Sequence, residues 1–183
     1  MALIAKDCLC GDRKVGKTSL RIRYLGRDFQ SEFLPTSSGE FSSKKAQIEV
    51  GSESRELQFQ IWDLAEHRTF NQERTLYFKQ TVGSFIMLDI TRSETLFNLE
   101  RWVDELNWNS GSGNLSIFVL GNRADLTKDE NKVYREKATS FINNHLENKF
   151  DNIDEKISFS EISTKTSENF NQALSKFDIK IYT

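Results

Sequence analysis

The stretch from Ala2 to Thr18, ALIAKDCLCGDRKVGKT, carries the most structural information in this chain. Its first part, Ala2–Cys10, has the length and apolar character of a buried strand. Gly11–Thr18 fits the pattern G-x-x-x-x-G-K-[ST], and Gly16–Leu25 is compatible with a helix. A strand, a glycine-containing loop and a helix in this order aim backbone N–H groups and the positive end of a helix at an anion. The stretch therefore predicts a phosphate-binding loop at the start of an α/β domain.

Two side chains of this loop have predicted chemical roles. Lys17 is expected to reach the terminal phosphates of a nucleotide, and the Thr18 hydroxyl is expected to ligate Mg²⁺. The other residues predicted to line the phosphates are Gly11, Asp12, Arg13, Lys14, Val15, Gly16 and Ser19.

The rest of the chain alternates short apolar runs with helical patterns, which is typical of an α/β domain built around a mostly parallel sheet. Phe41–Val50 and Leu57–Trp62 each alternate, and with Gly51–Ser54 between them they predict an antiparallel hairpin. We therefore expect a six-stranded, mostly parallel sheet with one antiparallel edge hairpin, flanked by five helices. The remaining strands are expected at Gly83–Ile90, Leu115–Leu120 and Lys156–Ile162.

Apolar stripes at helical spacing mark the expected helices. One stripe runs from Leu96 to Leu106, and Thr91 and Glu94 precede it at capping-box spacing. Asp7 is a charge inside the first predicted strand, and we expect it near the strand end, facing solvent and without function. Two further helical stripes lie within Ala138–Leu146 and Asn169–Phe177.

Composition excludes several classes of protein. A chain of 183 residues, 37% of them hydrophobic, fits one domain over residues 1–183. A net charge of -2 gives no basic field for nucleic acid, and no apolar run reaches the roughly 18 residues of a membrane span. Ala2 stands where myristoylation requires glycine. Cys8 and Cys10 share one strand face, and we expect them to be buried thiols in a reducing cytoplasm.

A second motif, Asn122-Arg123-Ala124-Asp125, directly follows the apolar strand IFVLG. Together with the phosphate loop and the segments FLPTSSGEF, WDLAEHRTF and EISTK in the same order, it makes the chain resemble the Ras superfamily of small GTPases, and most closely its Rab-like branch. The resemblance covers nearly the whole chain. It implies the P-loop NTPase fold and guanine nucleotide, GTP or GDP, as the ligand, with Mg²⁺.

The resemblance also implies a base pocket. Asp125 would accept hydrogen bonds from the guanine ring N–H and amino groups, and Asn122 would brace the pocket. Arg123 replaces the usual lysine of the family, and its planar guanidinium can still pack over the base. Phe29 falls where the family stacks an aromatic ring on the opposite face. The remaining pocket segment is Ser163-Thr164-Lys165, whose backbone N–H at Thr164 would read the guanine oxygen.

The family's metal ligands and switch segments have counterparts here. Thr36 would close over Mg²⁺ and the third phosphate, and Asp63 would hold a Mg²⁺-bound water. The switch regions would be residues 29–41 and 63–80, which would bind protein effectors, an exchange factor and an activating protein. Ser37 and Phe33 depart from the family in the first region, which predicts unusual partner recognition.

Two departures fall on the chemistry. Glu66 replaces the glycine whose N–H senses the third phosphate, and His67 replaces the glutamine that orients the attacking water. A carboxylate about 6 Å from a phosphate charge costs on the order of 3 kcal/mol at an effective dielectric of about 20. A simpler interpretation makes both residues exposed members of a switch loop. Either interpretation predicts slow intrinsic turnover.

The phosphate loop departs from the family as well. Arg13 and Lys14 stand where the family keeps small residues against the phosphates. We hypothesise that Glu66 pairs with Arg13 or Lys14 across the nucleotide. A competing hypothesis makes Arg13 a built-in arginine finger that stabilises charge in the transition state. The expected catalytic residues are therefore His67, Glu66, Arg13 and Lys17.

Three functions remain open at this point. The first is a slow GTP-hydrolysing switch with partners of a signalling or trafficking type, and the second is a hydrolysis-deficient GTP- or GDP-binding interaction module. An ATP-using enzyme is disfavoured by Asn122 and Asp125. The segment 126–156 is longer than the family's and predicts an elongated helix and loop, which is either a solvated insert or a partner surface. The C-terminal SKFDIKIYT has no cysteine for prenylation, so either a lipidated tail lies beyond this sequence or the protein works without a lipid. We expect a cytoplasmic monomer that can reach membranes through partners.

Overall fold

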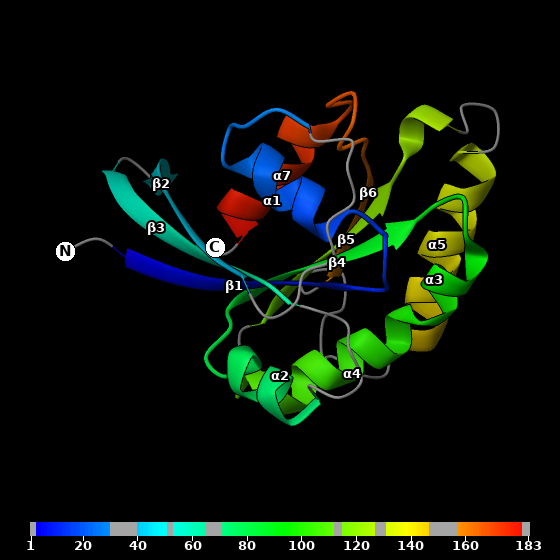
Figure 1. Cartoon of the computed structure of the whole chain (residues 1–183), viewed down its shortest axis with the longest axis horizontal. Coiled ribbons are helices and arrows are strands. Elements are labelled where there is room, and N and C mark those ends of the chain that lie inside the picture. The colour runs from blue at the N-terminus through cyan, green and yellow to red at the C-terminus, as the bar shows by residue number, and fades with distance from the viewer. Residues whose placement is uncertain are drawn as a thin grey trace.

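A computed structural model describes residues 3–29, 40–50, 53–64, 71–111, 115–126, 131–146 and 157–180. Its sheet has the order β2-β3-β1-β4-β5-β6, in which β2 is antiparallel to β3 and every other pairing is parallel (Figure 1). The predicted mostly parallel sheet with its edge hairpin is therefore confirmed. The strands are β1 (Leu3–Gly11), β2 (Glu40–Val50), β3 (Glu53–Asp63), β4 (Gly83–Asp89), β5 (Ser116–Asn122) and β6 (Ile157–Glu161).

Helices cover both faces of the sheet. α1 and α7 lie on one face, and α2, α4 and α5 lie on the other (Figure 1). α3 and α4 together occupy the single helix predicted around the stripe Leu96–Leu106, with a break at Asn98. Counted as one, they bring the helices that flank the sheet in the described part of the chain to the expected five. α2 lies inside the segment 63–80, where the sequence predicted a switch region and no helix. The helices are α1 (Lys17–Tyr24), α2 (Asn71–Phe78), α3 (Ser93–Phe97), α4 (Leu99–Ser110), α5 (Asn131–Leu146) and α7 (Phe170–Lys180), with a 3₁₀ turn, η2, at Ala124–Leu126.

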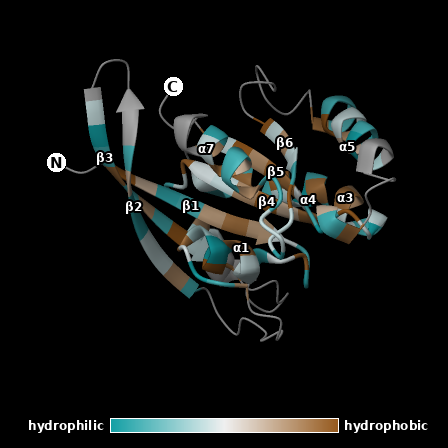
Figure 2. Cartoon of the chain, turned by 90° about the horizontal axis from the view of Figure 1, so that it is seen from above, coloured by the Kyte–Doolittle hydropathy of each residue, from teal (hydrophilic) through white to brown (hydrophobic). Residues whose placement is uncertain are grey.

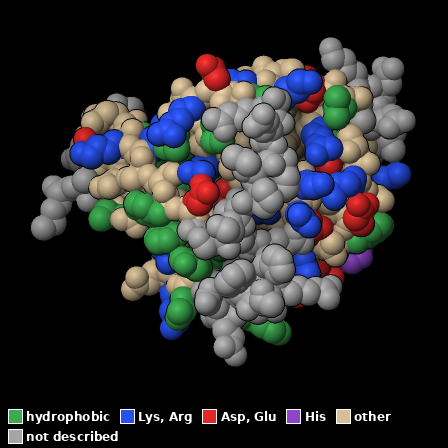
Figure 3. All heavy atoms as spheres, in the orientation of Figure 1, with side chains coloured by type: hydrophobic (Ala, Val, Ile, Leu, Met, Phe, Trp, Pro, Cys, Tyr) green, Lys and Arg blue, Asp and Glu red, His purple; other side chains and the backbone are tan. Residues whose placement is uncertain are grey.

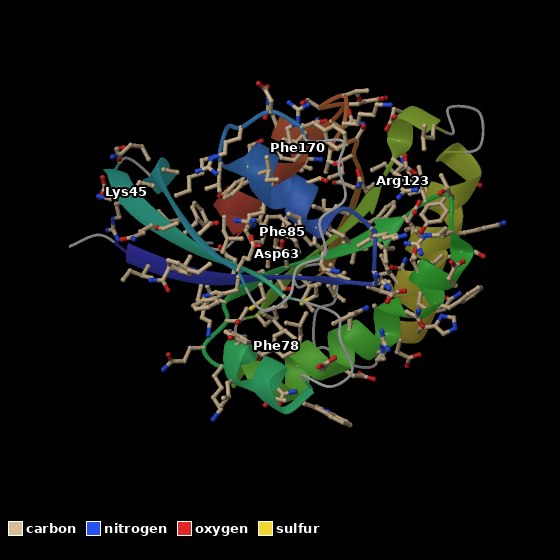
Figure 4. The ribbon with its side chains drawn as sticks, viewed as in Figure 1. Lys45, Asp63, Phe78, Phe85, Arg123 and Phe170 are labelled. Carbon is tan, nitrogen blue, oxygen red and sulfur yellow. The ribbon has the colours of Figure 1, made fainter. Side chains whose placement is uncertain are left out.

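Each face of the sheet has its own hydrophobic core, as expected for parallel strands buried on both sides. All residues of β4 are buried, and the central strands form the hydrophobic band in Figure 2. Phe85 and Phe177 pack with their ring centroids 3.9 Å apart on the α1 and α7 side. Phe78 of α2 is fully buried on the opposite side, and Figure 4 shows it across the sheet from Phe170.

Three local predictions were wrong. Asp7 pairs within the middle of β1 and is completely buried, so it does not face solvent near a strand end. The hairpin strands extend further than predicted, and only residues 51–52 separate them. Thr91 does not cap α3, because its hydroxyl donates to Asp89 Oδ1 at 2.6 Å.

The carboxyl ends of the parallel strands converge on one edge of the sheet, where open α/β sheets bind ligands. Gly11 ends β1, Asp63 ends β3 and Asn122 ends β5. Two more acidic residues, Asp89 and Glu161, end β4 and β6. The fold therefore brings the phosphate loop, the predicted metal ligand and the predicted base motif to one place.

Candidate functional site: a phosphate loop, a metal carboxylate and a base pocket

The phosphate loop follows β1 and leads into α1. A Cβ on Gly11 would lie 2.3 Å from the Met87 carbonyl oxygen, and one on Gly16 would lie 2.3 Å from Asn122 Nδ2. Both glycines also have positive φ, 128° and 107°, so the close approach and the backbone each require glycine there. Lys14 has φ 63° although it carries a side chain, which is a strained conformation.

The side chains of Lys17 and Asp12 point in different directions from this loop. Lys17 Nζ donates to the carbonyls of Gly11 at 2.7 Å and Asp12 at 2.9 Å, so its ammonium lies across the loop. The Asp12 carboxylate points away from the loop into α4, where it accepts from Trp102 Nε1 at 3.0 Å and Asn98 Nδ2 at 2.7 Å. Of the predicted phosphate-lining residues, Asp12 can therefore offer its backbone and not its carboxylate. Sequence reasoning missed its partners, because they lie more than 80 residues away.

The predicted metal ligands Thr18 and Asp63 meet beside the loop. Thr18 Oγ1 donates to Asp63 Oδ2 at 2.8 Å, and Asp63 is completely buried. Its other oxygen, Oδ1, has no hydrogen-bond partner within the described part of the chain. Burial raises the pKa of Asp63, although Thr18, Lys17 and Arg21 oppose the shift. A buried carboxylate oxygen without a donor, next to a hydroxyl, fits a hard divalent cation.

The residues predicted for the base pocket form one hydrogen-bonded unit with the phosphate loop. Asn122 Nδ2 donates to the Val15 carbonyl at 2.8 Å, and Asn122 Oδ1 accepts from Thr164 N at 3.0 Å. Ser163 Oγ donates to Asp125 Oδ1 at 2.6 Å and holds the half-buried Asp125 carboxylate in place. The Thr164 N–H was expected to read the guanine oxygen, but in this structure it donates to Asn122.

Comparison with known proteins bears on the same residues. The family model described as the Ras family matches residues 6–183. This chain belongs to the Ras family. It is 30% identical to the Ras-related protein Rab-13 of Rattus norvegicus over 93% of this chain and 76% of that protein. It is 32% identical to the Ras-related protein YPTC6 of Chlamydomonas reinhardtii over 97% of this chain and 74% of that protein.

The expected resemblance to Rab-like small GTPases is thus confirmed, and with it the P-loop fold. Members of this family bind GTP and GDP, typically with Mg²⁺. A third relative, the Ras-related protein RABA5c of Arabidopsis thaliana, is 35% identical over 66% of this chain and 54% of that protein. No helix among the described residues is long and apolar enough to cross a membrane.

A charged cluster behind the phosphate loop was not predicted from the sequence. Asp89 is completely buried, and its Oδ2 lies 2.8 Å from Arg92 Nε and 3.1 Å from Arg123 Nη1. Arg92 Nη2 donates to the Arg13 carbonyl at 2.9 Å, and Arg123 Nη2 donates to the Lys14 carbonyl at 3.1 Å. One carboxylate therefore positions two guanidinium groups against consecutive carbonyls of this Ras-family phosphate loop.

This cluster changes the expectation for Arg123. Its guanidinium was expected to pack over the base, but it is hydrogen-bonded to Lys14 and paired with Asp89. Burial of Asp89 opposes ionisation, yet the hydrogen bonds from Thr91 and Arg92 outweigh it, so the pKa of Asp89 is lowered. Figure 3 shows Lys and Arg side chains gathered in the half of the view where Figure 4 places Arg123.

The other predicted site residues are exposed or half-buried, or lie outside the described residues. The side chains of Arg13 and Lys14 are exposed, Phe29 is half-buried, Ser19 is half-buried and Lys165 is exposed. Thr36, Glu66 and His67 lie outside the described residues, so the pairing of Glu66 with Arg13 or Lys14 stays a prediction.

A row of three packed aromatic rings joins the two predicted switch regions. The ring centroids of Phe41 and Trp62 are 4.9 Å apart, and those of Trp62 and Tyr77 are 5.1 Å apart. Phe41 is 50% exposed, which is unusual for a ring of that size. The row crosses β2, β3 and α2, and no periodic pattern in the sequence joins these three residues.

Proposed function

We propose that this chain is a guanine-nucleotide-binding switch that hydrolyses GTP to GDP slowly. The observation that carries the proposal is the position of Asn122. Its amide bonds to the phosphate loop at Val15 and to the base loop at Thr164, so the two loops are held at a fixed separation. A rigid spacing of this kind suits a ligand that carries a base at one end and phosphates at the other.

The chain's own residues take the following parts in binding. The backbone from Gly11 to Ser19 cradles the phosphates, and Lys17 contributes its charge beside them. Thr18, Asp63 and Thr36 would hold Mg²⁺, which would neutralise part of the charge of the phosphates. Asp125, fixed by Ser163, accepts from the guanine ring, which adenine cannot satisfy because it presents no matching pair of donors.

The remaining contacts surround the base. Phe29 supplies an apolar face, and the stem of Arg123 supplies the other while its guanidinium remains with Asp89. Thr164 meets the guanine oxygen through an N–H shared with Asn122. Lys165 follows on the same loop, where its carbonyl accepts from Arg23 Nη2 at 2.7 Å and fixes the loop against α1.

Slow hydrolysis follows from the two replacements in the second switch region. His67 is shorter than glutamine and holds an attacking water less well, while Glu66 adds negative charge near the third phosphate. Arg13 and Lys14 offset the charge of Glu66, because their basic side chains are exposed on the phosphate loop, which would hold the third phosphate. Arg13 acts as a partner of Glu66 in this proposal and not as an arginine finger.

Effectors, an exchange factor and an activating protein bind through the switch regions 29–41 and 63–80. The aromatic row supports this part of the proposal, because Phe41 is half exposed on top of the partly buried rings of Trp62 and Tyr77, and aromatic residues are enriched at protein interfaces. We assign residues 1–183 to one domain that works as a monomer in the cytoplasm and does not bind nucleic acid.

The test is single-turnover hydrolysis of GTP bound beforehand to the purified protein with Mg²⁺. Native protein is compared with Glu66→Gly, His67→Gln and the double variant. His145→Gln is the matched control, because His145 is the chain's other histidine and is exposed on α5. We expect slow cleavage by the native chain, faster cleavage by the Glu66 and His67 variants, and no change in the control.

Two outcomes would replace the proposal. GTP that stays intact in the native chain and is cleaved only by the double variant identifies a hydrolysis-deficient binding module. ATP that competes as well as GTP identifies an ATP-using protein and removes the role of Asp125. Competition by GDP and GTP together, without ATP, supports the guanine-specific site.

A further inference from the structure

Arg21 reaches the metal carboxylate from inside α1. It lies three residues after Thr18, almost one helical turn, and both side chains point toward the end of β3. Arg21 Nε lies 3.6 Å from Asp63 Oδ2, the same oxygen that accepts the Thr18 hydroxyl at 2.8 Å. Figure 4 labels Asp63 near the centre of the molecule, where β3 ends. Arg21 is therefore a permanent cation next to the predicted metal site.

The same guanidinium also reaches β2. Arg21 Nη1 donates to Ser42 Oγ at 2.9 Å, and Arg21 Nη2 forms an ion pair with Glu40 Oε2. Arg21 is only 14% exposed at its side chain, whereas Glu40 is 47% exposed. Glu40 and Ser42 lie at the start of β2, where the predicted first switch region, residues 29–41, ends. One arginine thus links the metal carboxylate to the strand on which this switch region ends.

The positive charge of Arg21 would affect the binding of a cation at Asp63. A cation that takes the Thr18 hydroxyl and an Asp63 oxygen as ligands would share its carboxylate with the guanidinium. Two positive groups on one carboxylate repel each other, and the buried position of Asp63 keeps water from screening them fully. Glu40 works in the opposite direction, because it draws the guanidinium toward β2 and neutralises part of its charge.

We infer that Arg21 is a positioning residue that weakens Mg²⁺ binding and thereby sets how fast the nucleotide is released, with Glu40 as its counterweight. The inference rests on the proposed nucleotide and metal site. It assigns a role to two residues outside the phosphate loop and the base pocket. The two residues have opposite effects, which a purely structural ion pair would not produce.

The experiment measures release of a fluorescent GDP analogue from purified protein in excess unlabelled GDP over a series of free Mg²⁺ concentrations. The readout is the Mg²⁺ concentration at which release is half-suppressed. Arg21→Gln removes the charge, Arg21→Lys keeps it, and Glu40→Gln removes the counterweight. Lys45→Gln and Glu56→Gln are the matched controls, because this exposed pair joins the same two strands at 2.8 Å and lies away from Asp63.

We expect the half-suppressing Mg²⁺ concentration to fall about tenfold in Arg21→Gln, which corresponds to about 1.4 kcal/mol. Glu40→Gln should raise it about threefold, a smaller change because Glu40 is half exposed. Arg21→Lys should resemble the native chain, and both controls should be unchanged.

Equal midpoints in native protein and Arg21→Gln would overturn the inference, as would shifts of the same sign in Arg21→Gln and Glu40→Gln. Circular dichroism of each variant shows whether it folds. If Arg21→Gln does not fold, the comparison of Glu40→Gln with Arg21→Lys tests the inference. GDP release that is independent of Mg²⁺ in the native chain would instead overturn the proposed metal site itself.

Discussion

Replacing Lys14 by glycine should stabilise this protein. Lys14 has φ 63°, and the left-handed region costs a residue with a Cβ about 1–2 kcal/mol. Glycine removes this strain but loses about 0.5–1 kcal/mol more backbone entropy on folding. The carbonyl that accepts from Arg123 is part of the backbone and is retained. The net effect is a gain of about 0.5–1 kcal/mol, which for a domain of this size raises the melting temperature by about 2 °C.

Chemical and thermal denaturation at a fixed nucleotide and Mg²⁺ concentration measure this gain. Lys14→Ala is the matched control, because it removes the ammonium and its stem but keeps the Cβ and hence the left-handed strain. The difference between the glycine and alanine variants isolates the backbone contribution from the charge of Lys14. A glycine variant no more stable than the alanine variant would refute the strain argument.

Asp89, Gly16 and the two buried cysteines each allow a further test. Asp89→Asn should lose about 2–3 kcal/mol of unfolding free energy, because two guanidinium groups lose their shared charge. The pKa of Asp89 is lowered in the folded state, so the carboxylate contributes fully to stability above the ordinary carboxyl pKa of about 4. This stabilisation is lost as the pH falls through the folded pKa. The Asp89→Asn variant should therefore lose less stability on acidification than the native protein. Gly16→Ala should weaken GDP binding in equilibrium titrations, because the new Cβ would lie 2.3 Å from Asn122 Nδ2; unchanged affinity would contradict this. A thiol reagent at neutral pH should leave Cys8 and Cys10 unmodified until the protein unfolds, because both are buried, the pKa of Cys8 is raised to about 12 and that of Cys10 is raised well above its usual value.

The sequence predicted the sheet and most helices because their signals are local. An apolar run, a helical stripe or a glycine-containing loop is read within about ten residues, and β4 and α7 both lie where such patterns placed them. Asp7 was misplaced because a charge in a strand pattern reads as an exposed end, whereas the pairing of β1 between β3 and β4 buries it. α2 was missed because its segment has no strong apolar stripe.

The candidate site likewise has features that are local in the sequence and features that depend on long-range contacts. Short segments of the sequence were enough to predict the phosphate loop and, through the family resemblance, the base motif and the metal ligands Thr18 and Asp63. The folded chain was needed to show that Asp12 faces α4, that Asp89 positions two arginines against the phosphate loop, and that Arg21 reaches the carboxylate of Asp63. Apart from the Asp89 and Arg92 pair, these contacts join residues from 34 positions apart, for Asp89 and Arg123, to 109 positions apart, for Lys14 and Arg123. Parallel strands bring such residues together at their carboxyl ends without leaving a periodic trace in the chain.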